Sequence, residues 1–102
     1  MTQLSDTFAA LGDATRLSIV DRLLQQGELS AGDLQDVADM SAPAISRHLK
    51  VLRNAGIIQQ RVDGQRRMYS VEPTRVRAIH QWTMDHQTFW AGSLDRLAAA
   101  LD

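Results

Sequence analysis

The hydrophobic period of the chain changes at Gly56, and this change restricts the folds that the chain can adopt. Before Gly56, apolar residues recur every three or four positions, the spacing of helices with one buried face. After it, residues 57–62 and 66–71 have the pattern of two short strands, and Asp63-Gly64 between them is a strong signal for a tight hairpin turn. The helical period returns after Pro73. The sequence therefore predicts four helices, a hairpin and a last helix, a mainly α fold with a small β-hairpin, in one domain over residues 1–102.

Capping residues delimit the four expected helices before Gly56. The first spans residues 4–11, and the second follows the N-cap residue Asp13 and ends at Gly27. The third spans residues 30–38, and the fourth starts at Ser41 and runs to residue 55. The apolar positions that repeat at helical spacing in the second helix are Leu17, Val20, Leu23 and Leu24, with Ile19 beside them, and the buried stripe of the fourth helix is expected to be Ile45, Leu49 and Leu52.

The last helix is expected to run from about residue 74 to residue 101. At 1.5 Å per residue it would be about 40 Å long, more than the width of roughly 30 Å of a small domain. Gly92 inside it is expected to mark a kink or a close helix crossing. Because so small a body cannot cover the whole apolar side of this helix, we expect part of it to pack on a second copy of the chain. The apolar residues of the helix proposed for that interface are Trp82, Phe89, Trp90, Leu94, Leu97 and Leu101.

Charge is strongly segregated along the chain, although the formal net charge is only −1. Residues 1–40 carry two basic and seven acidic side chains, whereas residues 41–67 carry six basic and one acidic. We call these two segments the acidic block and the basic block. A basic block in an acidic chain indicates a local anion-binding surface, although a solvated charged face is the simpler alternative.

The basic block coincides with a helix-turn-helix pattern, formed by residues 30–38 and 41–55. In such units the second helix enters the major groove of DNA, and its first residues meet the base edges. The hairpin that follows would place further arginines beside the groove. Adjacent strand residues face opposite sides, so one of Arg66 and Arg67 is expected to reach DNA. The candidate DNA-binding residues are Ser41, Ala42, Pro43, Ser46, Arg47, Lys50, Arg61, Arg66 and Arg67.

Four ordered motifs carry a resemblance to a known family. Residues 11–17 (LGDATRL), 41–52 (SAPAISRHLKVL), 55–58 (AGII) and 63–69 (DGQRRMY) resemble the ArsR/SmtB family of bacterial winged-helix repressors. The resemblance implies a winged helix-turn-helix fold and a homodimer formed through the first and last helices, residues 1–11 and 74–102, which adds Leu4 and Phe8 to the interface. It also implies binding to an imperfect inverted repeat of double-stranded DNA. The inducer of the branch without metal sites is unknown, which leaves a small-molecule effector open.

The chain departs from the family where metals bind. Ser30 occupies the place of the cysteine of the thiolate sensors, and the chain has no cysteine at all. On the last helix, His80 and His86 are six residues apart, so they lie on different faces and cannot chelate one ion together. The sequence therefore predicts no metal and no cofactor. The alternative within the family is a zinc-type repressor with a site shared across the dimer by His80, Asp85 or His86.

Other readings remain as alternatives. A winged-helix module that binds protein is disfavoured by the basic block, and an enzyme is disfavoured because no catalytic motif stands out. Trp82, Phe89 and Trp90 are more typical of an interface core than of a ligand pocket. His48, next to the buried stripe of its helix, is expected to be a structural hydrogen-bonding residue. No export signal or membrane span is recognisable, so we expect a cytoplasmic protein without a membrane partner.

Overall fold

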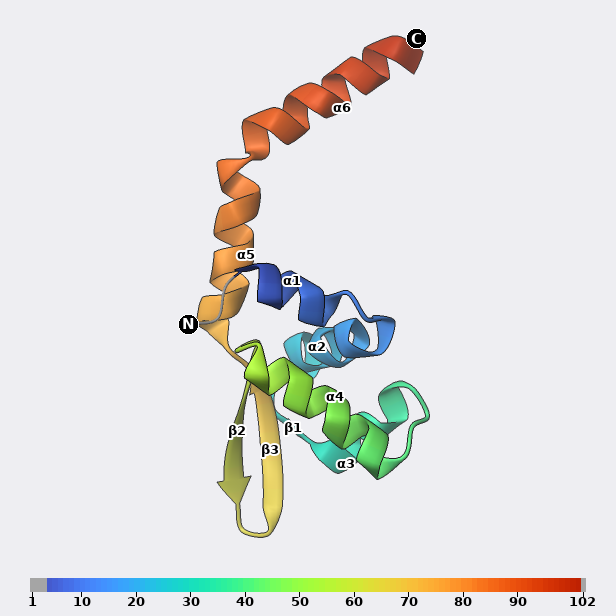
Figure 1. Ribbon diagram of the computed structural model, residues 1–102, viewed down its shortest axis with the longest axis vertical. Coiled ribbons are helices and arrows are strands. Elements are labelled where there is room, and N and C mark those ends of the chain that lie inside the picture. Colours follow the sequence, from blue (N-terminus) through green and yellow to red (C-terminus); the bar gives the residue numbers. More distant parts are fainter. Residues whose placement is uncertain (1–3, 102) are drawn as a thin grey trace.

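The computed structural model describes residues 4–101 and measures 58 × 30 × 21 Å (Figure 1). The helices are α1 (Leu4–Leu11), α2 (Ala14–Gln26), α3 (Ala31–Leu34), the short 3₁₀ helix η1 (Gln35–Val37), α4 (Ala42–Asn54), α5 (Pro73–Asp85) and α6 (Gln87–Leu101). The strands are β1 (Leu29–Ser30), β2 (Ile58–Asp63) and β3 (Arg66–Val71). The predicted fold class, mainly α with a β-hairpin wing, is confirmed. Residues 1–3 and 102 of the expected dimerisation segments lie outside the described residues.

The predicted caps determine where three helices begin. The carboxylate of Asp13 accepts the backbone N–H of Arg16 at 3.0 Å, and α2 starts behind it. Ser30 and Asp33 form a complete capping box, each side chain accepting the backbone N–H of the other residue. The hydroxyl of Ser41 accepts the backbone N–H of Ala44, and Pro43 occupies the first turn of α4.

The core lies between α2, α4 and the strands. Its fully buried large apolar side chains are Ile19, Leu34, Ile45, Leu49, Leu52 and Ile57. The expected stripe of α4 is buried as predicted. The prediction for α2 was partly wrong, because Val20 and Leu23 are buried but Leu17 and Leu24 are exposed. The inner face of α2 is completed by Ile19, which lies between Leu17 and Val20 in the sequence.

The sheet has three antiparallel strands in the order β1-β3-β2. The hairpin is present, but its turn is one residue later than expected: Asp63 pairs with Arg66, and the loop is Gly64-Gln65. Gly64 has a φ of +64°, the conformation that a two-residue hairpin loop with glycine in first position requires. The two-residue strand β1 was not predicted. It joins the turn after α2 to the hairpin, with Leu29 opposite Tyr69.

The lengths predicted for the third and the last helix were wrong. The third helix has only the four residues of α3, followed by η1. The last helix is not continuous, since α5 ends at Asp85 and α6 begins at Gln87. Thr83, Asp85 and His86 are weak helix formers, and the N–H of His86 bonds to the carbonyl of Thr83, one residue short of the α-helical partner. Gly92, where a kink was expected, lies inside α6.

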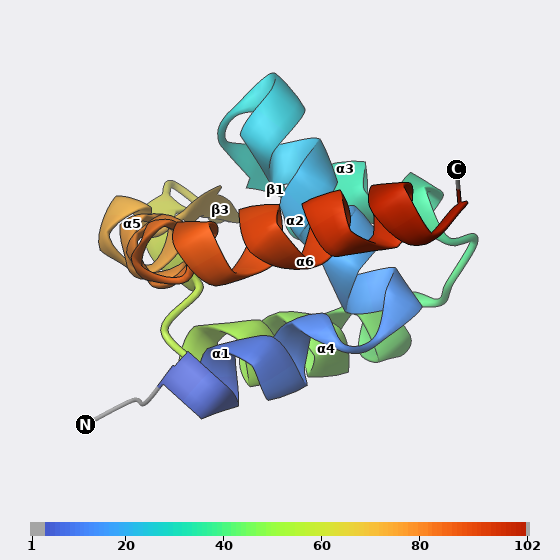
Figure 2. The same ribbon diagram turned by 90° about the horizontal axis from the view of Figure 1, so that it is seen from above.

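The break at His86 changes the direction of the chain. Viewed from above, α5 is seen end-on whereas α6 is seen along its length (Figure 2). The C-terminal end of α6 and the tip of the hairpin lie at opposite ends of the molecule (Figure 1). Within residues 4–101, no helix combines the length and the apolar character that crossing a membrane requires.

Candidate nucleic-acid interface

Helix α4 presents one apolar face to the core and one polar face to solvent. Ile45, Leu49 and Leu52 anchor the helix with exposed fractions of 0–1%. The side chains predicted to meet DNA are all exposed on the other side: Ser41, Ala42, Pro43, Ser46, Arg47 and Lys50. The apolar face of α4 thus packs against the core, while its polar face is accessible to solvent.

The two cations of this exposed face are unpaired. Across residues 4–101, neither Arg47 nor Lys50 has a hydrogen-bond or ion-pair partner in the protein. An unpaired guanidinium keeps all five of its N–H donors available for phosphate or for the edge of guanine. Such a pair on the exposed face of the second helix of a helix-turn-helix unit suits contact with a duplex.

A groove of about 460 Å³ separates the start of α4 from the hairpin. Ser46 lines it from α4, and Arg67 and Tyr69 line it from β3. Its other walls are Ser30, Ala31, Gly32, Gln65 and Arg66. The structure therefore brings Ser46 of the recognition helix and the wing arginines Arg66 and Arg67 to one hollow, although they are twenty residues apart in the chain.

The register of the hairpin divides the wing arginines between its two faces. Arg67 is directly opposite Val62 and shares its face with the buried Tyr69, two residues further along β3. Arg61 and Arg66 lie on the other face, because strand residues alternate. Arg67 is exposed and has no partner within the described part of the chain. It is thus the unpaired wing cation on the face that continues toward the core and α4.

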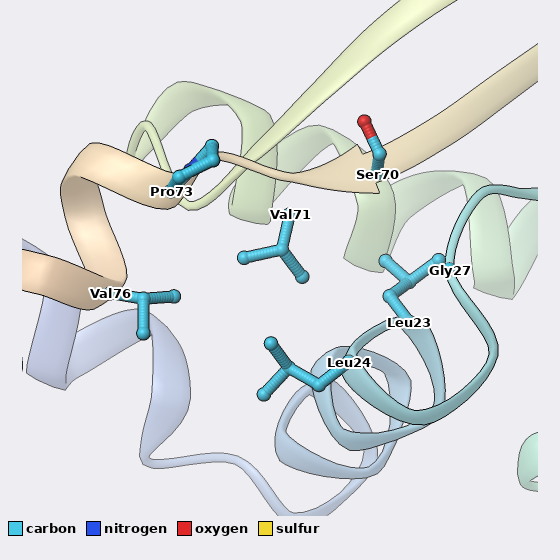
Figure 3. Close-up of a pocket in the computed structure, with 7 residues that line it drawn as sticks. All are labelled: Leu23, Leu24, Gly27, Ser70, Val71, Pro73 and Val76. Carbon is cyan, nitrogen blue, oxygen red and sulfur yellow. The ribbon is translucent and has the colours of Figure 1, made fainter.

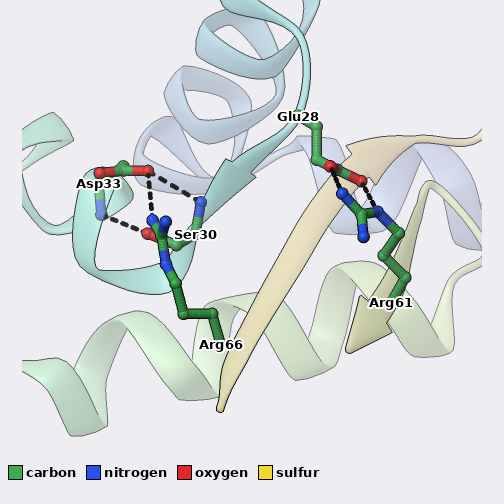
Figure 4. A network of polar contacts seen from close by, with 5 residues as sticks. All are labelled: Glu28, Ser30, Asp33, Arg61 and Arg66. Atoms are coloured by element: carbon green, nitrogen blue, oxygen red, sulfur yellow. Dashed lines mark hydrogen bonds and ion pairs between the residues drawn. The ribbon is translucent and has the colours of Figure 1, made fainter. Parts of the chain in front are cut away.

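Arg61 and Arg66 are instead paired with acidic residues of the first half of the chain (Figure 4). The Nε and Nη2 atoms of Arg61 donate to the two carboxylate oxygens of Glu28 at 2.7 and 2.5 Å. This bidentate contact lowers the pKa of Glu28 and raises the pKa of Arg61. Arg66 Nη2 lies 3.6 Å from Asp33 Oδ2. The pKa of Asp33 is lowered first by its hydrogen bonds with Ser30 and then by the charge of Arg66.

His48 links α4 to α2, in agreement with its predicted structural role. Its Nδ1 atom lies 3.4 Å from Nη1 of Arg16 and 4.0 Å from Oδ2 of Asp13. Arg16 also donates from Nε to the carbonyl of Ala10, in the last turn of α1. The sequence reasoning did not single out Arg16 as the residue that joins three helices, because its partners are 6 and 32 positions away.

The apolar residues predicted for the dimer interface are largely uncovered. Apart from the half-buried Leu4, their exposed fractions range from 38% for Trp82 to 79% for Leu101. Phe8 and Trp82 make an edge-to-face ring contact with centroids 5.5 Å apart, which joins α1 to α5. On α6, Trp90, Leu94, Leu97 and Leu101 recur at alternating spacings of four and three, so they form one continuous seam.

An apolar hollow in the described part of the chain lies away from these aromatic rings. A groove of about 380 Å³ runs between the end of α2, the end of β3 and the start of α5. Leu24, Val71 and Val76 point into it, whereas the hydroxyl of Ser70 points away (Figure 3). The remaining lining residues are Leu23, Gly27 and Pro73. The alternative of a ligand pocket at Trp82, Phe89 and Trp90 therefore does not coincide with the hollowed apolar surface.

Two of the three candidates for a zinc-type site, Asp85 and His86, are engaged in local contacts, whereas His80 is exposed on α5. The Nδ1–H of His86 donates to the carbonyl of Trp82 at 2.8 Å, and the centroids of the two side-chain rings are 4.8 Å apart. Asp85 accepts a hydrogen bond from Gln81. Within one copy of residues 4–101, no three His, Asp or Glu side chains are grouped so that they could hold a metal ion.

The known proteins that are similar to this chain are transcriptional regulators. Residues 13–60 match the family described as bacterial regulatory protein, arsR family. The HTH-type transcriptional regulator Rv2034 of Mycobacterium tuberculosis is 40% identical over 93 residues, which cover 91% of this chain and 83% of that protein. The transcriptional repressor SdpR of Bacillus subtilis is 34% identical, with 80% and 90% coverage. A crystal structure described as a possible transcriptional regulator for arsenical resistance superposes with a TM-score of 0.71 and 35% identity, covering 93% of this chain and 95% of that one.

Proposed function

The chain belongs to the ArsR family of bacterial transcriptional regulators, and on that premise we propose that it represses transcription as a homodimer bound to an inverted-repeat operator. Its relatives are transcriptional regulators, which confirms the prediction of a DNA-binding regulator and not an enzyme. The observation that carries the proposal is the outward face of α4, where Ser46, Arg47 and Lys50 are exposed while Ile45 and Leu49 lock the helix to the core.

Each proposed contact has a chemical role. Arg47 and Lys50 supply unpaired positive charge, and displacement of counterions by such groups provides most of the affinity for a duplex. Arg47 and Ser46 can also donate to base edges, whereas Ala42 and Pro43 offer only apolar contact with thymine methyl groups or close backbone approach. With so few base-reading side chains, the shape of the operator would supply part of the specificity.

The wing would add phosphate contacts beside the groove. Arg67 could contact a phosphate without any rearrangement, because it is exposed, has no partner among the described residues and lines the same groove as Ser46. Arg61 and Arg66 would have to leave Glu28 and Asp33 first.

The proposed dimer uses the terminal helices, residues 4–11 and 73–101 of the described chain. Its support is the exposed seam of α6 together with the Phe8–Trp82 contact, because large apolar side chains gathered along one helix face indicate an interface. A twofold pair would present two α4 helices to successive major grooves about 34 Å apart. A repressor of this kind would work in the cytoplasm, on the chromosome.

The test is selection of bound duplexes from a random pool by the full chain, followed by a titration of affinity against salt. We expect the selected sequences to share two half-sites in inverted orientation. Arg47→Ala should weaken binding to the selected duplex by about 1–3 kcal/mol and should weaken binding to a random duplex much less. The matched control is Arg77→Ala, since Arg77 is exposed on α5 and has no ion-pair partner among residues 4–101. Failure to enrich any sequence, or an equal loss on both duplexes, would contradict base reading by Arg47.

A further inference from the structure

Within residues 4–101, contacts between acidic and basic side chains connect the acidic block to the basic block. They join Asp13 to His48, Glu28 to Arg61, and Asp33 to Arg66. The last two hold both arginines of one face of the wing, whereas Arg47, Lys50 and Arg67 have no such partner in the described chain. The acidic block is therefore folded against part of the proposed DNA-binding surface.

The contact between Glu28 and Arg61 is the stronger of the two. Arg61 is on β2, and its guanidinium reaches over β3 to Glu28, which precedes β1 (Figure 4). Both carboxylate oxygens are engaged, and the two side chains are still 31% and 57% exposed. A planar fork bonded to two oxygens is the same arrangement that arginine forms with a DNA phosphate. The carboxylate and a phosphate consequently compete for one guanidinium.

We propose that Glu28 is a built-in competitor of DNA phosphate at the wing and so lowers the affinity of the protein for every duplex. The proposal rests on the DNA-binding function above and adds an affinity-determining residue to it. Asp33 acts in the same way on Arg66 but more weakly, since its contact is a single one at 3.6 Å and the carboxylate is also held by Ser30. Neither acid touches DNA; each acts through the arginine that it holds.

The experiment compares Glu28→Gln with the natural chain. The variant keeps the shape and the hydrogen-bonding oxygen of the side chain but loses its charge. We expect binding about two- to fivefold tighter per protomer at moderate salt, the range for removing one exposed ion pair that opposes binding. The slope of log affinity against log salt should become steeper by about 0.9 for each phosphate that a released Arg61 neutralises. The gain should be equal on selected and random duplexes, because phosphates carry no sequence information.

Two further variants make the result specific. In an Arg61→Ala background, the same Glu28→Gln change should give no gain, since the released cation is gone. Asp21→Asn, an exposed acid of α2 without an ion-pair partner in residues 4–101, removes the same charge elsewhere and should leave the affinity near that of the natural chain. An unchanged or weaker affinity of Glu28→Gln overturns the proposal, and so does an equal gain from Asp21→Asn. If the natural chain binds no duplex at any salt concentration, the proposed function fails instead.

Discussion

Arg16 of α2 and His48 of the recognition helix meet with Nη1 and Nδ1 3.4 Å apart, beside the carboxylate of Asp13. Arg16 simultaneously binds the carbonyl of Ala10 at 2.7 Å. One partly buried side chain thus joins α1, α2 and α4, the helices that connect the proposed dimer interface to the proposed DNA-reading surface.

We expect Arg16→Met to lower stability, because the apolar part of the side chain is kept while both polar contacts are lost. Hydrogen bonds from a charged donor are typically worth about 1.5–3 kcal/mol. The midpoint of urea unfolding, followed by circular dichroism, should fall accordingly. Arg22→Met on the same helix, where no partner is present in the described residues, should shift it much less. Equal midpoints for the two variants would contradict the joining role of Arg16.

The two adjacent wing arginines should contribute differently to DNA binding. Arg67→Ala is expected to weaken binding to all sequences and to reduce the salt slope by about 1, as the loss of a phosphate contact does. Arg66→Ala should have the smaller effect, since Arg66 is already paired with Asp33. Fluorescence anisotropy with a labelled duplex at several salt concentrations measures both values. A loss for Arg66→Ala as large as that for Arg67→Ala would contradict the idea that pairing with Asp33 limits the contact of Arg66 with DNA.

The seam of α6 should determine assembly. Leu97→Glu places a charge in the middle of the exposed row formed by Trp90, Leu94, Leu97 and Leu101, and we expect monomers in sedimentation equilibrium. Ala99→Glu is the matched control, because two positions along an α-helix is close to the opposite side. Dimers that persist in Leu97→Glu, or that are lost equally in both variants, would refute the interface.

Acid should weaken the capping box of α3. The hydrogen bonds with Ser30 hold the pKa of Asp33 below its ordinary value of 3.8, and the nearby Arg66 adds to this. A carboxylate with a lowered pKa in the folded state stabilises that state above the ordinary value, and this contribution is lost as the pH falls through the lowered pKa. Asp33→Asn should therefore reduce the melting temperature near neutral pH, and the difference from the natural chain should shrink below pH 3.8. A difference that does not vary with pH would show that the charge of Asp33 contributes nothing.

Local signals predicted the fold well because most of its elements are encoded by neighbouring residues. Asp13, Ser30 and Ser41 cap helices where expected, and the burial of Ile45, Leu49 and Leu52 places Arg47 and Lys50 on the exposed face. Structure that depends on distant partners was missed. The strand β1 is too short to show a period and exists only by pairing with β3. The break at His86 contains neither proline nor glycine, so nothing in the local sequence marks it strongly.

The pairing of wing arginines with acids was equally invisible from the sequence. Glu28 and Arg61 are 33 positions apart, and the chain brings them together only after β1 has joined the hairpin. The charge pattern identified which segment is basic, but it did not reveal which cations of that segment are free.

The opposite signs of the acidic and basic blocks have a consequence for the approach to a polyanion. A molecule with a net charge of −1 feels little overall attraction to a distant duplex, which limits indiscriminate adhesion to nucleic acid. Within residues 4–101, the cations without an acidic partner, Arg47, Lys50 and Arg67, belong to the surface proposed to bind DNA, so that surface keeps a local attraction for phosphate although the whole chain is nearly neutral.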